Sequence, residues 1–210
     1  MYVPAAFAES DLATLHEFIE RHGFGLLCSQ HGGTPLASHL PLLIDRTGGA
    51  QGTLRGHMAR ANPQWRGGAT DGLAIFMGPD SYITPSYYAT KRETEKVVPT
   101  WNYVTIHAYG QVSFSEDLDE LLNVVTRLTD RQEGKRVSPW AVSDAPPKFI
   151  QAQLKGIIAL RMPITRLQGK WKMSQNRTDA DRAGVVDGLR ADGNETVAAM
   201  VADLRAPSGG

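Results

Sequence analysis

The sequence predicts a mainly β protein with peripheral helices, built around an antiparallel sheet or barrel. Four short segments with β-strand character follow one another between residues 24 and 77, before the first long crossover helix. Neighbouring parallel strands need a crossover connection, usually a helix. A run of strands without intervening helices therefore favours antiparallel pairing over a doubly wound parallel sheet.

Alternating hydrophobic residues and the turn residues between them define the expected strands. These strands are 24–30, 35–45, 51–60, 72–77, 103–114 and 156–167. Glycines in 47–52 predict a hairpin connection, because glycine adopts the positive φ of tight turns. Residues 78–100 are rich in Pro, Tyr and Thr and predict a long irregular loop, a kind of segment that is often functional.

Helices are expected where hydrophobic residues recur every three to four positions. Ser10 can cap a helix that ends before Gly23, and a second runs from Glu116 to Gly134. Further helices are expected at 147–155, 178–190 and 195–204. We expect a main domain over 1–170 and a helical extension over 171–210 that packs on it.

Composition points away from several classes of function. The chain has 22 basic and 22 acidic residues among 210, so it lacks the basic excess typical of nucleic-acid binders. DNA binding therefore remains possible but finds no support in the charge. The single cysteine, Cys28, cannot form a disulfide within one chain. Neither a signal peptide nor a membrane-spanning segment is expected, so the predicted location is the cytoplasm.

Residues 54–65 combine cations, an amide and an aromatic ring. If 51–60 is a strand, Arg55 and His57 point to the same face. Asn62 followed by Pro63 is a typical helix start. A helix N-terminus beside Arg60 would offer N–H donors and a guanidinium to an anion. The alternative is a surface turn with solvated side chains.

Residues 82–88 and 98–103 supply aromatic rings within the expected loop. Trp101 and its neighbouring tyrosines can stack on or edge a planar ligand. Asn102 offers both a donor and an acceptor to the edge of a heterocycle. The alternative is an aromatic cluster that packs under a long loop.

Residues 170–177 follow a strand and precede a helix. Lys170 and Lys172 are two residues apart, so they share a strand face. Gln175 and Asn176 place amide groups beside them. This block can hold an anion, or it can be a basic turn that caps a helix.

Other chemistries find little support. His16, Glu20 and His22 lie on an amphipathic helix without zinc-ligand spacing. The sequence has neither a Gly-x-Ser-x-Gly elbow nor a P-loop. Cations together with aromatic rings suit a phosphorylated aromatic cofactor better than hydrolysis.

These blocks resemble the PaiB family, described as FMN-binding negative transcriptional regulators. The resemblance covers nearly the whole chain and differs by Tyr87, where the family motif is expected to have Trp. It rests on residues 1–4 with Phe7, 38–41, 56–63, 82–86 with Tyr88, 98–103 and 172–177.

The resemblance implies an antiparallel split β-barrel of the flavin-reductase and pyridoxamine-phosphate-oxidase type. It also implies a homodimer with FMN at the subunit interface. From the blocks we expect the cofactor-binding residues to be Arg55, His57, Met58, Ala59, Arg60, Asn62, Trp101, Asn102, Lys172, Gln175 and Asn176.

Within this set, Arg60, the Asn62 turn, Lys172 and Gln175 are predicted to hold the phosphate. Three functions stay open at this point. They are a flavin-dependent regulator, a flavin oxidoreductase that uses a reduced nicotinamide, and a haem protein with His57 or His107 as axial ligand.

Overall fold

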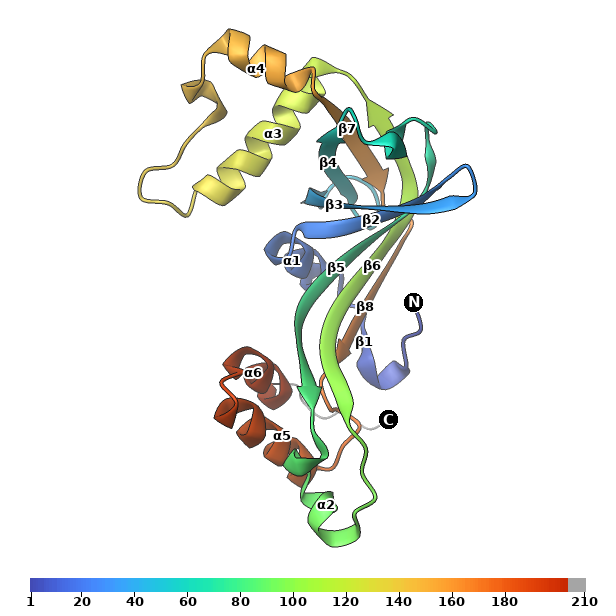
Figure 1. Cartoon of the computed structure of the whole chain (residues 1–210), viewed down its shortest axis with the longest axis vertical. Helices are drawn as coiled ribbons and strands as arrows, with labels where there is room; N and C mark the ends of the chain where they lie inside the picture. Colours follow the sequence, from blue (N-terminus) through green and yellow to red (C-terminus); the bar gives the residue numbers. More distant parts are fainter. Residues whose placement is uncertain (204–210) are drawn as a thin grey trace. The chain divides into compact units, whose positions relative to one another are not determined.

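The structure is a computed structural model that describes residues 1–203. Its sheet has eight strands in the order β1-β8-β6-β5-β2-β3-β4-β7, with a further pairing between β6 and β7 (Figure 1). Because β6 pairs with β5 on one side and β7 on the other, six of the strands form a closed ring. The pairings of β1–β8, β2–β3, β2–β5, β3–β4, β4–β7 and β6–β7 are all antiparallel. The predicted fold class, an antiparallel barrel with helices, is thereby confirmed.

The chain divides into two compact units. The first, here called the barrel unit, comprises residues 12–76 and 107–167. The second, here called the terminal unit, comprises residues 1–11 and 77–106 together with the chain from residue 168 onward. Strands β5, β6 and β8 contribute residues to both units. The division expected from the sequence, 1–170 and 171–210, stays a prediction.

The barrel unit holds most of the strands and three of the α-helices. Its elements are α1 (Leu12–Arg21), β2 (Phe24–His31), β3 (Thr34–Asp45), β4 (Thr53–Ala59), η2 (Pro63–Trp65), α3 (Leu118–Glu133), η4 (Val142–Asp144), α4 (Pro147–Leu154) and β7 (Ile157–Pro163). The first part of β5 (Thr70–Ile83) and the second part of β6 (Thr100–Ser115) complete it.

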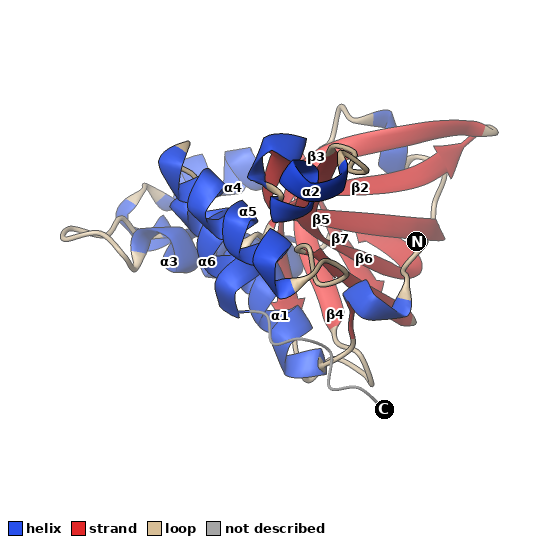
Figure 2. Cartoon of the chain, turned by 90° about the horizontal axis from the view of Figure 1, so that it is seen from below, coloured by secondary structure: helices blue, strands red, loops and turns tan. Residues whose placement is uncertain are grey.

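Strands β2 and β3 form a hairpin with a two-residue turn (Figure 2). Gly32 and Gly33 occupy the turn with φ of 56° and 80°. Two consecutive positive φ values match the right-handed twist of paired strands, and glycine adopts them without steric cost. The expected connection at 47–52 joins β3 to β4, with positive φ at Gly49 and Gly52.

Two helices of the barrel unit bury one face each. Helix α1 buries Leu15, Phe18 and Ile19. Helix α3 buries Leu121, Val124 and Leu128, and begins where the Asp117 carboxylate accepts a 2.8 Å hydrogen bond from the Glu120 amide. The expected periodicities are thus confirmed. Helix α1 begins at Leu12, two residues after Ser10, so Ser10 is not its cap, and Asp117 is the N-cap of α3 and not part of its first turn.

The terminal unit contains η1 (Ala5–Phe7), β1 (Ala8–Glu9), η3 (Pro85–Tyr87), α2 (Ala89–Thr94), α5 (Asp179–Ala191), α6 (Glu195–Asp203) and parts of β5, β6 and β8 (Arg166–Lys172). Helix α5 docks on η3 and α2. The Asp181 carboxylate is buried and accepts 2.9 Å bonds from both the amide and the hydroxyl of Thr90. The Tyr87 hydroxyl donates to Asp192. The expected helix at 195–204 is found as α6, and Leu204 lies outside the described residues.

Two sequence expectations were wrong. The expected loop at 78–100 contains the rest of β5, which continues through Pro79 to Ile83, followed by η3 and α2. Proline is unfavourable inside a strand because it cannot donate a hydrogen bond to the neighbouring strand. Here the pairing of β5 with its neighbours outweighs this cost, and the strand continues through Pro79. The expected strand 156–167 is two strands, β7 and β8, which are separated at Ile164 and Thr165. The amides of these two residues bond instead to the carbonyls of Gly52 and Tyr109.

Candidate flavin-binding site

The predicted site residues are divided between the two units. Arg55, His57, Met58, Ala59, Arg60 and Asn62 lie in the barrel unit. Trp101, Asn102, Lys172, Gln175 and Asn176 lie in the terminal unit. Each set is described on its own below.

Arg55 lies on β4 and is half-buried between two acids. Its Nε is 3.4 Å from the Asp45 carboxylate and its NH1 is 3.3 Å from the Glu120 carboxylate. Asp45 is on β3 and Glu120 on α3, so this arginine links the helix to the strands. The side chain therefore has a structural role, and contact with a ligand stays a prediction.

His57 points to the same side of β4 as Arg55, as the alternation predicts. Its Nδ1 is buried and has no hydrogen-bond partner. Burial lowers the pKa of His57, because the charged imidazolium is disfavoured in a poorly hydrated site. The ring is consequently neutral at pH 7, with a nitrogen that can accept or donate one further bond.

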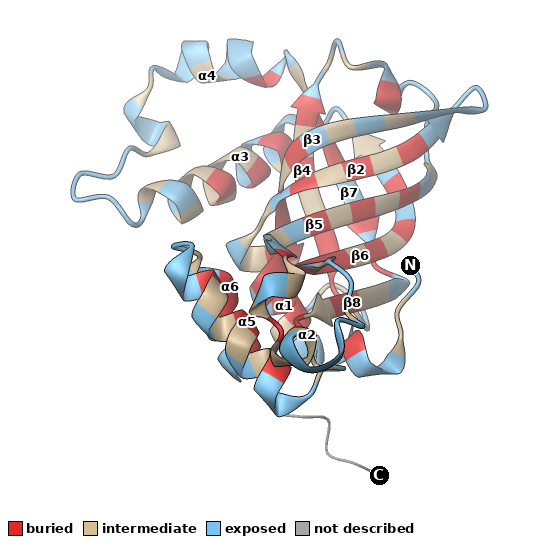
Figure 3. Ribbon diagram, turned by 60° about the horizontal axis from the view of Figure 1, so that its bottom comes forward, coloured by how far each residue is buried: buried red, intermediate tan, exposed pale blue. Residues whose placement is uncertain are grey.

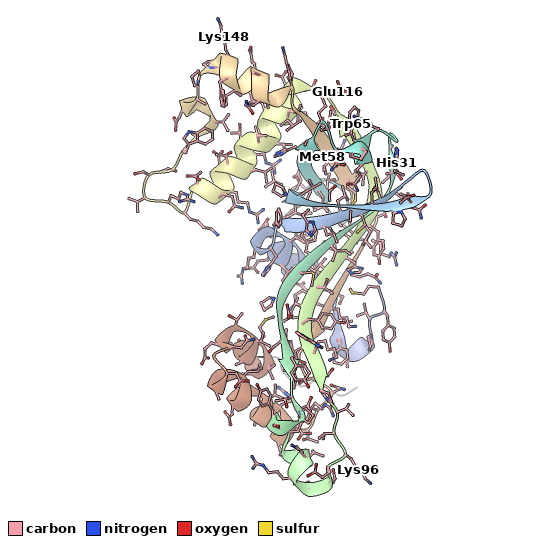
Figure 4. All side chains as sticks on the ribbon, viewed as in Figure 1. His31, Met58, Trp65, Lys96, Glu116 and Lys148 are labelled. Atoms are coloured by element: carbon pink, nitrogen blue, oxygen red, sulfur yellow. The ribbon has the colours of Figure 1, made fainter. Side chains whose placement is uncertain are left out.

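The neighbouring residues of β4 differ in exposure. Met58 is fully buried in the barrel core (Figure 4), whereas Ala59 is exposed at the end of the strand. Met58 and Ala59 pair with Ile158 and Ile157 of β7. A cofactor contact from either residue stays a prediction.

Residues 60–65 form a tightly bonded turn. Asn62 caps η2, because its Oδ1 accepts a 2.9 Å bond from the Gln64 amide, and its Nδ2 donates to the Ser38 hydroxyl at 2.7 Å. The Trp65 indole donates to the Arg60 carbonyl at 2.9 Å. Asn62 is thus a cap, as predicted. The element it caps is a three-residue 3-10 turn, too short for the macrodipole that was expected to attract an anion.

Arg60 also contacts the second half of the barrel unit. Its Nε donates to the Lys155 carbonyl at 2.7 Å, and its NH1 is 3.1 Å from the Glu116 carboxylate. Both Arg60 and Glu116 are partly exposed. An anion that binds Arg60 must therefore compete with Glu116.

The terminal unit presents two exposed aromatic rings side by side. Trp101 is 54% exposed and Tyr82 is 48% exposed. Their ring centroids are 5.9 Å apart at an interplanar angle of 68°. This edge-to-face arrangement is favourable for aromatic pairs, and it holds a large apolar surface in contact with water.

A buried polar pair anchors the loop after β8. Asn102 and Ser174 are both buried, and their side chains bond to each other at 3.0 and 3.2 Å. The Gln175 side chain folds back on its own loop, where it accepts from the Met173 amide at 2.7 Å and donates to the Trp171 carbonyl. Asn176 is exposed. The side-chain amides of Asn102 and Gln175 therefore hold the loop in place. Of the three amide residues, Asn176 is the exposed one.

Three cations surround this loop. Lys172 is half-buried, and its Nζ donates to the Thr100 hydroxyl at 2.6 Å and to the Trp101 carbonyl. Lys170 lies two residues earlier on β8 and is 8% exposed. The Arg177 guanidinium lies 4.6 Å from the centre of the Tyr88 ring.

Lys170 and Arg177 were not among the predicted binding residues. The signal that could have found them is the charge pattern of 170–177, where three cations occur without an acid before Asp179. The tyrosines that contact them, Tyr2 and Tyr103 for Lys170 and Tyr88 for Arg177, come from distant parts of the chain.

A separate cavity of about 550 Å³ lies in the barrel unit between α3, η4 and α4. Its lining is mostly apolar and includes Leu122, Val142, Ile150 and Leu154. None of the predicted site residues lines it.

The closed antiparallel ring with flanking helices defines a split-barrel class of protein. Solved structures share this fold, and two of them align as follows. The FAD and heme binding protein from Mycobacterium smegmatis aligns with a TM-score of 0.57 and 14% identity, over 79% of this chain and 73% of that one. The flavocytochrome Anf3 from Azotobacter vinelandii aligns with a TM-score of 0.56 and 12% identity, over 84% of this chain and 75% of that one.

Sequence comparison is more specific. A family model described as "Putative FMN-binding domain" matches residues 1–166. The Bacillus subtilis protein named "Protease synthase and sporulation protein PAI 2" is 33% identical over 202 residues, which cover 95% of this chain and 94% of the relative. An uncharacterized Emericella nidulans protein, AN0679, is 35% identical over 241 residues and 96% of each chain. The chain belongs to the PaiB family of FMN-binding proteins, and FMN is the cofactor that this family assigns to it.

Among residues 1–203, the structure contains no helix that is long and apolar enough to cross a membrane.

Proposed function

We propose that the protein is an FMN-binding homodimer that acts as a flavin-dependent regulator, with FMN at the interface between two copies. The observation that carries the proposal is the exposed Trp101–Tyr82 pair beside Lys172, whose amino group bonds to the Trp101 carbonyl. An exposed aromatic surface next to a cation matches the two parts of FMN, an isoalloxazine ring and a phosphate. The proposed ligands are the eleven residues named from the sequence.

A regulatory role is supported by the Bacillus relative, which is named as a protease synthase and sporulation protein. The two chains align over almost their full lengths, so a shared role would depend on residues that both chains have. The zero net charge argues that DNA contact, where it occurs, uses few phosphates. We also propose a cytoplasmic location, where the free Cys28 stays reduced.

The homodimer is supported by an uncovered apolar face of the barrel unit. Phe24 is 69% exposed, and Leu26 and Cys28, which follow it on the same side of β2, are only half-buried. Their partners on β5, Ile75 and Leu73, are half-buried as well. Intermediate and buried residues alternate along β2 and β5 (Figure 3). Monomeric proteins rarely leave a contiguous apolar patch of this kind in water, and a second copy would cover it.

The cofactor part of the proposal is tested by titration of the protein with FMN and with riboflavin. Replacement of Trp101 by Leu should weaken both flavins, because an aromatic contact is lost. Trp140→Leu is the matched control, since Trp140 is similarly exposed, at 47%, in the barrel unit. If wild-type protein desalts colourless after incubation with FMN, the cofactor part of the proposal fails.

The phosphate part is tested with Arg60→Ala. A charge-assisted hydrogen bond contributes roughly 1.5–3 kcal/mol, so FMN affinity should fall about ten- to a hundredfold at ~1.4 kcal/mol per decade. Riboflavin lacks the phosphate and should be indifferent. Equal losses for both flavins would show that Arg60 acts through its contacts with Glu116 and Lys155.

Measurement of NAD(P)H turnover distinguishes a flavin oxidoreductase from a flavin-dependent regulator. A flavin reductase consumes NAD(P)H steadily when flavin is supplied, whereas a regulator gives at most one reduction per bound flavin. Steady-state consumption would favour the enzyme.

Haem binding is favoured by one observation, the neutral and unpartnered Nδ1 of His57. Neutral imidazole is the form that ligates metals. Two solved structures of the same fold are named as an FAD and heme binding protein and a flavocytochrome. A Soret band that forms on haem titration and disappears in His57→Ala would support this second candidate.

A further inference from the structure

Among residues 1–203, Lys170 is a buried cation without a carboxylate partner. Its Nζ donates to the Tyr2 carbonyl at 3.2 Å and lies 5.5 Å and 5.2 Å from the ring centres of Tyr2 and Tyr103. The backbone carbonyl and the two π faces solvate the ammonium in part. A buried lysine is normally paired with an acid, and this one is not.

Lys172 and Arg177 add two further positive charges to the same part of the terminal unit. Burial, followed by the charges of Lys170 and Arg177, lowers the pKa of Lys172. Lys172 therefore lies close to both other cations, and Lys170, two residues before it on β8, shares its face of the strand. Lys172 is held by the Thr100 hydroxyl and the Trp101 carbonyl, neither of which carries charge.

Within residues 1–203, no salt bridge involves Lys170, Lys172 or Arg177. Burial and, to a smaller extent, the charge of Asp181 raise the pKa of Tyr88, whose ring contacts the Arg177 guanidinium. The two carboxylate oxygens of Asp181 are already bonded to the amide and hydroxyl of Thr90. By contrast, Arg55 and Arg60 in the barrel unit are both paired with acids.

Three cations held together without counter-charge form a strong anion site, because their mutual repulsion is relieved when a dianion binds. We propose that Lys170, Lys172 and Arg177 form a binding site for a phosphate-monoester dianion. Lys172 and Arg177 contact the anion, and Lys170 contributes its charge from beneath the site. This inference rests on the proposed FMN binding only where the phosphate is that of FMN. A free phosphorylated ligand presents the same chemistry.

The site is tested with inorganic phosphate as the probe, measured by calorimetry on the full chain in a buffer without phosphate. Lys172→Met and Arg177→Met should each weaken phosphate binding about ten- to a hundredfold. Lys172→Arg, which keeps the charge, should restore most of the affinity. The matched control is Lys96→Met, because Lys96 is an exposed lysine of the same unit that points away from the chain (Figure 4).

FMN and riboflavin titrations of the same variants identify the source of the anion. If phosphate competes with FMN and the variants weaken FMN but not riboflavin, the site holds the FMN phosphate. If phosphate binds without displacing FMN, the site takes a separate phosphorylated ligand. Both outcomes support the site.

The proposal is overturned if wild-type protein binds no phosphate at millimolar concentration and the variants bind FMN as wild type does. Failure of the FMN proposal is distinguishable, because the protein would then bind phosphate at this cluster and no flavin. Far-ultraviolet circular dichroism of each variant separates loss of binding from loss of fold.

Discussion

The side chains of Asn102 and Ser174 bind each other twice. The Asn102 amide nitrogen donates to the Ser174 hydroxyl at 3.0 Å, and the hydroxyl donates back to the amide oxygen at 3.2 Å. Both residues are buried, and Ser174 has a φ of 65°, a left-handed value that is rare outside glycine. The pair therefore holds the loop that carries Gln175 and Arg177 in a conformation that the backbone alone disfavours.

Replacement of Ser174 by Ala should destabilise the protein by about 1–3 kcal/mol, because the buried Asn102 amide is left without its partner. Ser174→Gly loses the same bonds but adopts a positive φ freely, so it should be more stable than Ser174→Ala. Urea denaturation of the three proteins checks the order. Ser143→Ala, at an exposed residue, is the control and should leave the free energy of unfolding unchanged. Equal stability of the Ala and Gly variants would contradict the argument from φ.

Gly188 is expected to be indispensable for the docking of α5. A Cβ at this position would lie 2.2 Å from Cδ1 of the Tyr87 ring. Although Ala favours helices over Gly by about 1 kcal/mol, Gly188→Ala should lower the thermal midpoint. Ala183→Ser on the exposed side of the same helix is the control. A rise in midpoint for Gly188→Ala would show that Tyr87 moves away without cost.

The stability of the protein should fall between pH 10 and pH 12 in part through Tyr87. The hydrogen bond to Asp192 raises the pKa of Tyr87 to about 12, from an ordinary value of 10. The folded state therefore keeps a proton that the unfolded state has lost, so this contribution is complete below pH 10 and disappears as pH rises through 12. Titration of tyrosinate absorbance should show a tyrosine that titrates near pH 12 and is absent in Tyr87→Phe. Identical alkaline titrations of the two proteins would refute the bond.

Phe24→Asp should dissociate the proposed homodimer. A charge on the uncovered face would be desolvated on association, at a cost of several kcal/mol. Light scattering at tens of micromolar protein should give a dimer mass for wild type and a monomer mass for the variant. Phe149→Asp, at an exposed residue of α4, is the control. A monomeric wild type would count against the homodimer.

The barrel strands could be predicted because their hydrophobic alternation is local. The limits of β5 and the break between β7 and β8 could not, because partners far along the chain determine them. Ile164 bonds to Gly52 and Thr165 to Tyr109, and no local pattern signals either contact.

The same distinction applies to the candidate site. The residue types of the blocks indicated an anion and a ring, and the family comparison confirms FMN as the cofactor. The acids that pair with Arg55 and Arg60 were not foreseen, because Glu120 and Glu116 follow much later in the chain. The absence of such acids around Lys170 was visible only once the strands were placed.

The terminal unit is assembled from three stretches, 1–11, 77–106 and the chain from 168 onward. During vectorial synthesis on the ribosome, every residue of the barrel unit has been made once residue 167 is added, because its last stretch ends there. The stretch 77–106, by contrast, must wait for β8, α5 and α6. Domains generally fold as units as the chain emerges, so every residue of the barrel unit is available before the three cations of residues 170–177 can come together.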